Sequence, residues 1–424
     1  MDLELLAELR TRDDVLQAAA DLAGSDPLSS ATALRGRGVE PALAAAALTQ
    51  ATLRRAARAK FGPAADRMFF TRAGLEQATR GVVAERRAAR LAAAGVRSLA
   101  DLGCGLGSDA LAAARAGIHV YAVDADPLTA EIARANAAAL GLGELVEVHC
   151  ADATTVPVER FDAVFADPAR RRSGRGRVFD PAAFSPPWDF VAGLAQRVPR
   201  TVLKLAPGID HALLPPGAEG EWVSVGGDLV EAAFWCGPLA EVPRRAALCS
   251  ASREEADPGR GHGAADPSSP AVQARGVFGS ASSWEAEQRW RELTGPADVA
   301  APVGGLGRYL YDPDPAVVRS HLVAAFAATV DGRLADRDIA YVYADQPAET
   351  PFARCLEITD VLPFSLKRLR ALLRERGVGR LEIRKRGSAL EPDKLRRDLK
   401  LSGPAAAGLV LTRVAGAPTV LVTA

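Results

Sequence analysis

The chain has 424 residues, a length that favours two or three domains over one. Its apolar fraction of 48% and charged fraction of 25% are those of an ordinary globular protein, and no apolar run reaches the roughly 18 residues that a membrane span needs. The formal net charge is zero, but Ser365 to Lys400 carries 13 Lys and Arg against 5 Asp and Glu, so the basic residues are concentrated in one segment.

Residues 1–92 are predicted to form an N-terminal helical region. Alanine, leucine and arginine dominate it, and apolar residues recur at three- and four-residue spacing. Gly62-Pro63 interrupts the pattern, and a further helix is predicted from about Gly74 to a stop at Gly95. The acidic N-terminus lacks the basic-then-apolar order of a secretory signal, which predicts a cytoplasmic protein.

From Val96 onward, short apolar runs alternate with amphipathic helical segments, and residues 93–250 are predicted to form one α/β domain. The predicted strands are 96–101, 119–124, 145–150, 161–167, 201–205, 230–235 and 244–249, and the predicted helices include 108–115 and 127–139. Asp126 is placed as the N-cap of the second helix, with Pro127 as its first residue. Alternation of this kind predicts a parallel, doubly wound sheet, and the two last strands, without a long helix between them, predict an antiparallel edge.

Residues 251–303 are predicted to be a linker or mobile insertion, because Gly, Ala, Ser, Pro and Asp dominate most of it without periodicity. A second α/β unit is predicted over residues 304–424. Its expected strands are 339–343, 380–385, 408–414 and 419–422, and its expected helices are 365–375 and 392–400.

A glycine-rich turn follows the first predicted strand, with glycines at 103, 105 and 107 that permit positive φ and a close approach of a ligand. Asp124 ends the second strand and can accept both hydroxyls of a ribose. Asp152 ends the third strand at the same edge of the sheet, where ligands bind in open α/β folds, and suits an adenine amino group.

The segment Gly105–Ala110 alone also satisfies the dinucleotide pattern G-x-G-x-x-A. Asp101 distinguishes the two cofactors, because a carboxylate in the turn suits a cationic amino acid group and would repel a pyrophosphate. Together with the acids at the later strand ends, it favours a methyl donor over a nucleotide.

This arrangement resembles the class I S-adenosylmethionine-dependent methyltransferases over about residues 70–250. The resemblance implies a Rossmann-like fold with a mostly parallel seven-stranded sheet and S-adenosylmethionine as the cofactor. It also implies that the turn from Asp101 to Gly107 holds the methionine part, Asp124 with Ala125 the ribose, and Asp152 with Ala153 the adenine.

The acceptor site is predicted at the end of the fourth strand, where Asp167 and the carbonyl of Pro168 can orient an amino group. The segment resembles the D-P-P-aromatic motif of amino-methylating nucleic acid enzymes, but Ala169 and Arg170 replace its last two residues. Arg170 is therefore a candidate catalytic residue in place of the aromatic ring. The residues that could supply a base-stacking face instead are Phe179, Phe184 and Trp188. Lys204 lies in the fifth strand, and its side chain either reaches the acceptor pocket or extends to solvent.

Three further features indicate RNA. Arg170, Arg171 and Arg172 follow the Asp-Pro pair and can contact phosphates. The block from Met68 to Thr71 resembles the segment that covers the cofactor in the trimethylguanosine synthase group of RNA methyltransferases, which makes Thr71 a candidate cofactor contact. Residues 304–424 resemble a THUMP-like domain, and THUMP domains are RNA-binding modules, so the basic 365–400 segment is a candidate RNA surface.

The sequence therefore predicts an RNA methyltransferase. Two other functions stay open, a methyltransferase for a small molecule or protein, and a non-catalytic RNA-binding protein that retains the fold. No metal site is predicted, because the five cysteines and five histidines are scattered without ligand spacing.

Overall fold

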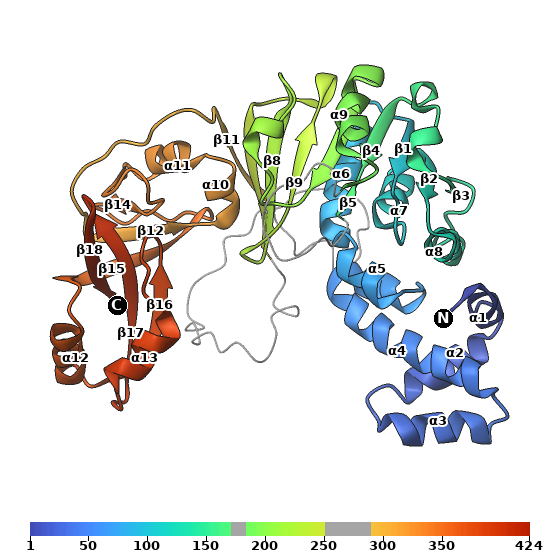
Figure 1. Ribbon diagram of the computed structural model, residues 1–424, viewed down its shortest axis with the longest axis horizontal. Helices are drawn as coiled ribbons and strands as arrows, with labels where there is room; N and C mark the ends of the chain where they lie inside the picture. Colours follow the sequence, from blue (N-terminus) through green and yellow to red (C-terminus); the bar gives the residue numbers. More distant parts are fainter. Residues whose placement is uncertain (171–183, 251–289) are drawn as a thin grey trace, which may run out of the picture. The chain divides into compact units, whose positions relative to one another are not determined.

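The computed structural model describes residues 1–170, 184–250 and 290–424 (Figure 1). The described residues form two compact units. Unit 1 contains 1–219 and 233–241, and unit 2 contains 220–232, 242–250 and 290–424. The boundaries drawn from the sequence, at 92, 250 and 303, stay predictions.

Unit 1 begins with helices, as the sequence predicted (Figure 1). They are α1 (Leu3–Leu9), α2 (Asp13–Asp21), α3 (Pro27–Gly36), α4 (Pro41–Phe61), the 3-10 turn η1 (Gly62–Asp66), α5 (Arg72–Gln77) and α6 (Gly81–Ala93). The side chains of Asp2, Asp26 and Glu40 cap three of the helix N-termini by accepting backbone N–H groups. The single helix expected from 74 to 95 is thus two helices, α5 and α6, with a break at residues 78–80.

Five strands of the unit 1 sheet are parallel to one another, in the order β3-β2-β1-β4-β7. The C-terminal end of β9 follows β7 in the strand order. Its strands and helices are β1 (Ser98–Leu102), α7 (Ser108–Arg115), β2 (His119–Asp124), α8 (Pro127–Ala139), β3 (Val146–Cys150), β4 (Ala163–Ala166), α9 (Trp188–Arg197) and β7 (Thr201–Leu205). Asp126 caps α8 as predicted, accepting from the backbone N–H of Thr129 at 2.8 Å. Short 3-10 turns connect β3 to β4, η2 (Ala153–Thr155) and η3 (Val158–Arg160). The doubly wound, mostly parallel sheet is confirmed, but in the described residues it has nine strands and not the expected seven, because β8 (Glu219–Val225) and β11 (Trp290–Gly295) were not predicted.

Unit 2 holds β8 (Glu219–Val225), whose first residue belongs to unit 1, most of β9 (Asp228–Trp235), β10 (Arg244–Cys249) and β11 (Trp290–Gly295), in the order β11-β10-β8-β9. Strand β8 was not predicted, and it separates the two late strands that were. The antiparallel edge is β11 on β10, and β11 lies within the range expected to be linker. The remaining residues of that range up to 289 lie outside the described residues.

A second sheet of unit 2 has the order β13-β14-β12-β15-β18-β17-β16. Its elements are β12 (Tyr309–Pro313), α10 (Pro315–Arg319), α11 (Val323–Thr329), β13 (Arg333–Leu334), β14 (Val342–Ala344), β15 (Ala353–Pro363), α12 (Leu366–Glu375), β16 (Val378–Lys385), α13 (Pro392–Leu399), β17 (Ala405–Val414) and β18 (Ala417–Thr423). Leucines of α12 and α13 pack with β17 and β18 in one apolar cluster.

The N-terminal helices and the parallel sheet of unit 1 share one hydrophobic core. It contains Leu43 of α4, Phe70, Leu91 of α6, Leu99 of β1 and Ile132 of α8, all nearly or fully buried. Burial of this continuous apolar surface fixes the N-terminal segment on the sheet that carries the predicted cofactor turn.

Candidate active site

The glycine-rich turn connects β1 to α7 and packs tightly against two neighbouring strand ends. Gly103, Gly105 and Gly107 all have positive φ, of 90°, 55° and 87°. The backbone N–H groups of Gly103 and Cys104 both donate to Val123 O of β2 at 2.9 Å, and a Cβ at Gly103 would lie 3.3 Å from Asp167 O. Only glycine adopts these angles at little cost while leaving the backbone open to a ligand.

Asp101, at the end of β1, is a fully buried carboxyl group. Neither of its oxygens has a hydrogen-bond partner among the described residues. Burial, together with the negative charges of Asp109 and Asp167, raises the pKa of Asp101 well above the usual carboxyl range. A buried acid without a partner is costly unless a cation binds beside it, so the site fits the ammonium of an amino acid group.

Asp124 joins the end of β2 to the glycine-rich turn. Its carboxylate accepts from the backbone N–H of Gly105 at 3.1 Å and from that of Asp126 at 3.0 Å. Burial raises the pKa of this half-buried carboxyl. Each oxygen keeps further acceptor capacity, which is what two ribose hydroxyls require.

Asp152 follows β3 beside this group, because Ala151 N donates to Asp124 O at 3.1 Å. The exposed Asp152 carboxylate caps η2, accepting from the backbone N–H of Thr154 at 2.8 Å and from its hydroxyl. These hydrogen bonds lower the pKa of Asp152. Next to these two aspartates, Ala153 is buried and Ala125 is exposed. Ala153 can therefore offer an apolar contact to a ligand, and the backbone at Ala125 is accessible to one.

Asp167 lies just beyond β4, opposite Lys204 of β7. Ala166 pairs with Leu203 in the parallel register, so the next residues along the two strands are Asp167 and Lys204. The Lys204 Nζ donates to the Asp167 carboxylate at 2.5 Å, and the lysine side chain is only 12% exposed. Lys204 therefore extends to Asp167 and not to solvent.

The segment after Asp167 turns back on itself. Residues Ala169–Arg170 form β5, which pairs with β6 (Phe184–Ser185). Phe184 and Trp188 are buried, with ring centroids 5.6 Å apart, so the expectation that they offer a base-stacking face is wrong. Arg171, Arg172 and Phe179 lie outside the described residues.

The block from Met68 to Thr71 is fixed next to the glycine-rich turn by a buried polar cluster. Asn136 of α8 accepts from Phe69 N at 2.6 Å and donates to Phe69 O and to Leu106 O, the latter at 3.0 Å. Thr71 caps α5 by accepting from Gly74 N at 3.0 Å, and a Cβ at Gly74 would lie 2.7 Å from the Leu106 side chain. The start of α5 thus lies against the turn, where a segment covering the cofactor is expected.

The sequence indicated Lys204 as a residue that could reach this pocket, but sequence reasoning missed Arg87, Asp109 and Asn136. Arg87 of α6 forms a buried ion pair with Asp109 of α7 and stacks over the Phe165 ring at 4.7 Å. The Lys204–Asp167 pair could have been found, because both residues lie in predicted parallel strands at matching positions. Arg87, Asp109 and Asn136 reach their partners only through the packing of helices, which the sequence does not show.

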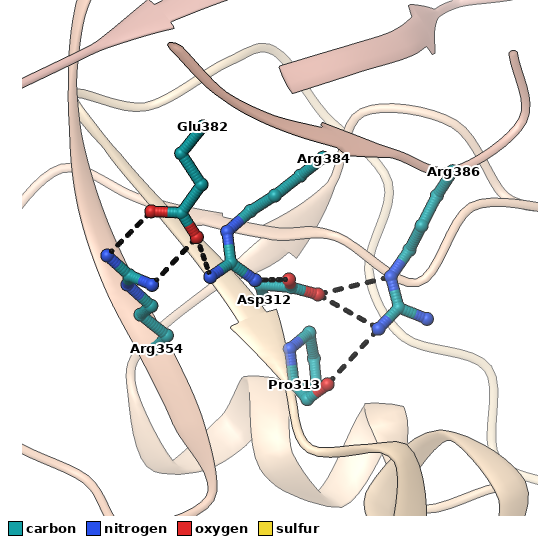
Figure 2. A network of polar contacts seen from close by, with 6 residues as sticks. All are labelled: Asp312, Pro313, Arg354, Glu382, Arg384 and Arg386. Carbon is teal, nitrogen blue, oxygen red and sulfur yellow. Dashed lines mark hydrogen bonds and ion pairs between the residues drawn. The ribbon is translucent and has the colours of Figure 1, made fainter. Parts of the chain in front are cut away.

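Much of the basic 365–400 segment is engaged in ion pairs within unit 2. Asp312 of β12 accepts from Arg384 at 2.8 Å and from Arg386 at 2.9 Å, while Glu382 binds Arg354 and Arg384 (Figure 2). The exposed basic side chains of this segment with no ion pair or hydrogen bond in the described part of the chain are Lys367, Arg368, Arg380, Lys394, Arg397 and Lys400.

Comparison with known proteins agrees with this geometry. Residues 99–170 match a family described as a methyltransferase domain, residues 353–424 match one described as THUMP domain-like, and residues 2–57 match a domain of unknown function. A structure from Porphyromonas gingivalis W83 described as a methyltransferase is 21% identical, covers 97% of each chain and superposes with a TM-score of 0.68, so it has the same fold.

The fold and the strand-end acids define the class as a Rossmann-like methyltransferase. Proteins from two Mycobacterium tuberculosis strains, CDC 1551 / Oshkosh and ATCC 25618 / H37Rv, are each described as an uncharacterized S-adenosylmethionine-dependent methyltransferase. Each is 33% identical over 387 residues, covering 88% of this chain and 93% of its own length. The chain belongs to the S-adenosylmethionine-dependent methyltransferases, and the predicted fold, activity and cofactor are confirmed. Among the described residues, no helix is long and apolar enough to cross a membrane.

Proposed function

We propose that this methyltransferase acts on a cytoplasmic RNA. The observation that carries the proposal is the THUMP-like match at 353–424 in the same chain as a methyltransferase domain. An RNA-binding type of module in the same chain as a catalytic domain is expected when the acceptor is a large, folded polyanion.

The cofactor's role is to supply an electrophilic methyl group on a sulfonium. Asp101 binds the ammonium of its amino acid part, and the glycine-rich turn, which lacks side chains at three positions, lets the cofactor approach the backbone closely. The Asp124 carboxylate accepts hydrogen bonds from the ribose hydroxyls, and the Asp152 carboxylate accepts one from the adenine amino group. Ala153 packs on the adenine ring. Helix α5, with Thr71 at its start, covers the bound molecule.

The acceptor group binds at Asp167 and the carbonyl of Pro168, beside Gly103 of the turn. In-line transfer needs an oriented lone pair and exclusion of water more than it needs acid–base chemistry. The carboxylate of Asp167 orients the acceptor by accepting its N–H. Lys204 acts as a positioning residue, because its 2.5 Å contact fixes the rotamer of Asp167.

RNA contacts are assigned to two places. Arg170, Arg171 and Arg172 follow the acceptor site directly in the chain. The second is the set of exposed basic residues of α12, β16 and α13 that have no partner among the described residues, which includes Lys367, Arg368 and Arg397 and fits phosphate contacts.

A methyltransferase for a small molecule or a protein is the second candidate. The network in Figure 2 favours it, since Arg384 and Arg386 serve internal ion pairs and do not present free charges. Exposed pairs of this kind add little to stability, but Asp312 is largely buried, so here they hold the strands of unit 2 together.

Filter binding of the intact protein to tRNA and to rRNA fragments over a salt series separates the two candidates. An RNA methyltransferase binds with an affinity that falls steeply as salt rises, by a logarithmic slope of about 0.7–0.9 per phosphate contact. Absence of binding at low salt, or binding that does not weaken with salt, contradicts the RNA proposal.

A further inference from the structure

A large groove in unit 1 lies apart from the strand ends that form the candidate active site. Its volume is about 1040 Å³, and it is lined by residues of α2, α4 and α8, by Arg10 just after α1, and by Asp66, Arg67 and Phe69. Pockets for small ligands have volumes of roughly 300–1,000 Å³, so this groove lies at the upper end of that range.

Five arginines line this groove, which we call the arginine groove: Arg10, Arg54, Arg55, Arg58 and Arg67. Two acids, Asp13 and Asp66, also line it, and Glu131 of α8 forms an ion pair with Arg10. The five arginines therefore meet three acids, and positive charge remains in excess. The convergence of like charges on one helix is costly, because Arg54 and Arg58 lie four residues apart on α4 and repel each other by a few tenths of a kcal/mol. Such a cluster of like charges is unexpected on a surface that has no binding function.

Most of these guanidinium groups use only one or two of their N–H donors in hydrogen bonds within the protein. Arg54 Nε donates to Met68 O at 2.8 Å and its guanidinium lies over the Phe69 ring, 5.0 Å from the centroid. Arg58 binds Asp66 through two of its nitrogens, and Arg67 donates through one nitrogen to Ala139 O. Since a guanidinium has five N–H donors, each keeps donors available in a fixed orientation.

Arg55 differs from the others. Its side chain is exposed, and it has no hydrogen bond or ion pair within the described ranges. An arginine in a groove with oriented neighbours and no internal partner of its own is suited to an external anion.

The wall of the arginine groove is linked to the cofactor turn through one side chain. Phe69 lines the groove, and Asn136 bonds both to the backbone of Phe69 and to Leu106 O of the glycine-rich turn. A ligand in the groove therefore contacts the same Met68–Thr71 block that lies against the turn.

We infer that the arginine groove binds the phosphate backbone of the RNA substrate. This inference rests on the proposed function and deepens it, because it assigns an RNA-binding role to the N-terminal helices. Bidentate arginine donors match phosphate oxygens, the groove has room for a segment of polymer, and contacts to the backbone read no sequence.

The test is fluorescence anisotropy of labelled bulk tRNA with the full chain, wild type against the double variant Arg55→Gln/Arg67→Gln. Bulk tRNA is a sufficient probe because phosphate contacts do not depend on sequence. The matched control is Arg35→Gln/Arg37→Gln, which removes the same charge from α3 and its C-cap, outside the groove. Arg55→Gln alone repeats the test without touching the Arg67–Ala139 hydrogen bond.

We expect the groove variant to bind tRNA on the order of tenfold more weakly near 0.15 M salt, with a logarithmic salt slope lower by about 1.4–1.8, the equivalent of two phosphate contacts. The control should bind as wild type does, and all variants should keep the wild-type affinity for S-adenosylmethionine in calorimetry. Unchanged tRNA binding by the groove variants overturns the inference while leaving the proposed function intact, and so does an equal loss in the control. Failure of the wild-type protein to bind tRNA at low salt contradicts both.

Discussion

Four aspartates at strand ends, assigned from the sequence to four different ligand groups, also differ in their burial and partners. Asp101 is fully buried with no partner in the part of the chain that is described, and Asp124 bonds to the turn beside it. Asp152 is exposed and caps a 3-10 turn, whereas Asp167 is paired with Lys204. Burial and partners, which depend on the fold, decide what each carboxyl group can bind.

Asp101→Asn should stabilise the protein without cofactor at alkaline pH. Because burial raises its pKa in the folded state above the ordinary 3.8, ionisation of Asp101 opposes folding. The loss of stability caused by this ionisation is absent below about pH 4, where the carboxyl is protonated in both states. It reaches its full size once the pH exceeds the raised pKa of Asp101 in the folded protein. We expect the free energy of unfolding in urea to be higher for the variant by at least about 1.4 kcal/mol at pH 8, the equivalent of one pKa unit, and equal to wild type near pH 4.

The same substitution should weaken binding of S-adenosylmethionine, since the ammonium loses its counter-charge. A variant that is no more stable than wild type at pH 8, yet binds the cofactor normally, would show that Asp101 neither carries a buried charge nor contacts the ligand.

Asp124→Ala should weaken cofactor binding by at least on the order of tenfold to a hundredfold, since even one of its two charge-assisted hydrogen bonds to the ribose contributes about 1.5–3 kcal/mol. Isothermal calorimetry measures this directly. Asp126→Ala is the matched control two residues away, because it removes only the cap of α8 and should lower stability by about 1 kcal/mol with no change in affinity. Equal affinities for all three proteins would remove Asp124 from the ribose site.

At the scale of elements, the sequence predicted the strand–helix alternation of unit 1 closely. Strand β2 and helices α7 and α8 have the predicted ends, because caps and hydrophobic period are local signals. The break between α5 and α6 was not predicted. The ammonium of Lys60 donates to the carbonyls of Leu75, Glu76 and Ala78, and this contact from α4 ends the helix.

Strand β8 was missed for a related reason. Glu219 and Glu221 interrupt its apolar pattern, yet both are buried, with Arg90 and Arg245 as their respective partners. Charged residues in a buried strand can be recognised only when the arginines that neutralise them are known.

The element that presents the cofactor turn depends on Asn136. Substitution Asn136→Ala leaves the N–H and carbonyl of Phe69 and the carbonyl of Leu106 without this partner in a buried position. Each buried group left unpaired costs about 1–3 kcal/mol, so urea unfolding should show a loss of at least about 2 kcal/mol. The affinity for S-adenosylmethionine should fall as well, because Leu106 belongs to the turn. A variant with wild-type stability would contradict the role of Asn136 as the anchor of the Met68–Thr71 block.

At the scale of the whole molecule, the chain combines a methyltransferase unit with a THUMP-like region. The sequence predicted both, and the glycine-rich turn with its strand-end acids was enough to identify the cofactor. The sequence could not show that some basic residues of the 365–400 segment form internal ion pairs. Arg386 and Asp312, for example, lie over seventy residues apart in the chain. Nor could the sequence show that five arginines of the N-terminal region line one groove.

The most direct test of the account is transfer of tritium from methyl-labelled S-adenosylmethionine to RNA extracted from cells that lack the protein. The wild-type protein should label RNA. Asp167→Ala should bind the cofactor with unchanged affinity but label RNA on the order of a hundredfold more slowly, because the acceptor is no longer oriented. The control Asp189→Ala, which removes an exposed carboxyl group from α9, should label RNA at the wild-type rate. No label in RNA with the wild-type protein, or full activity of Asp167→Ala, would contradict the proposed acceptor or its site.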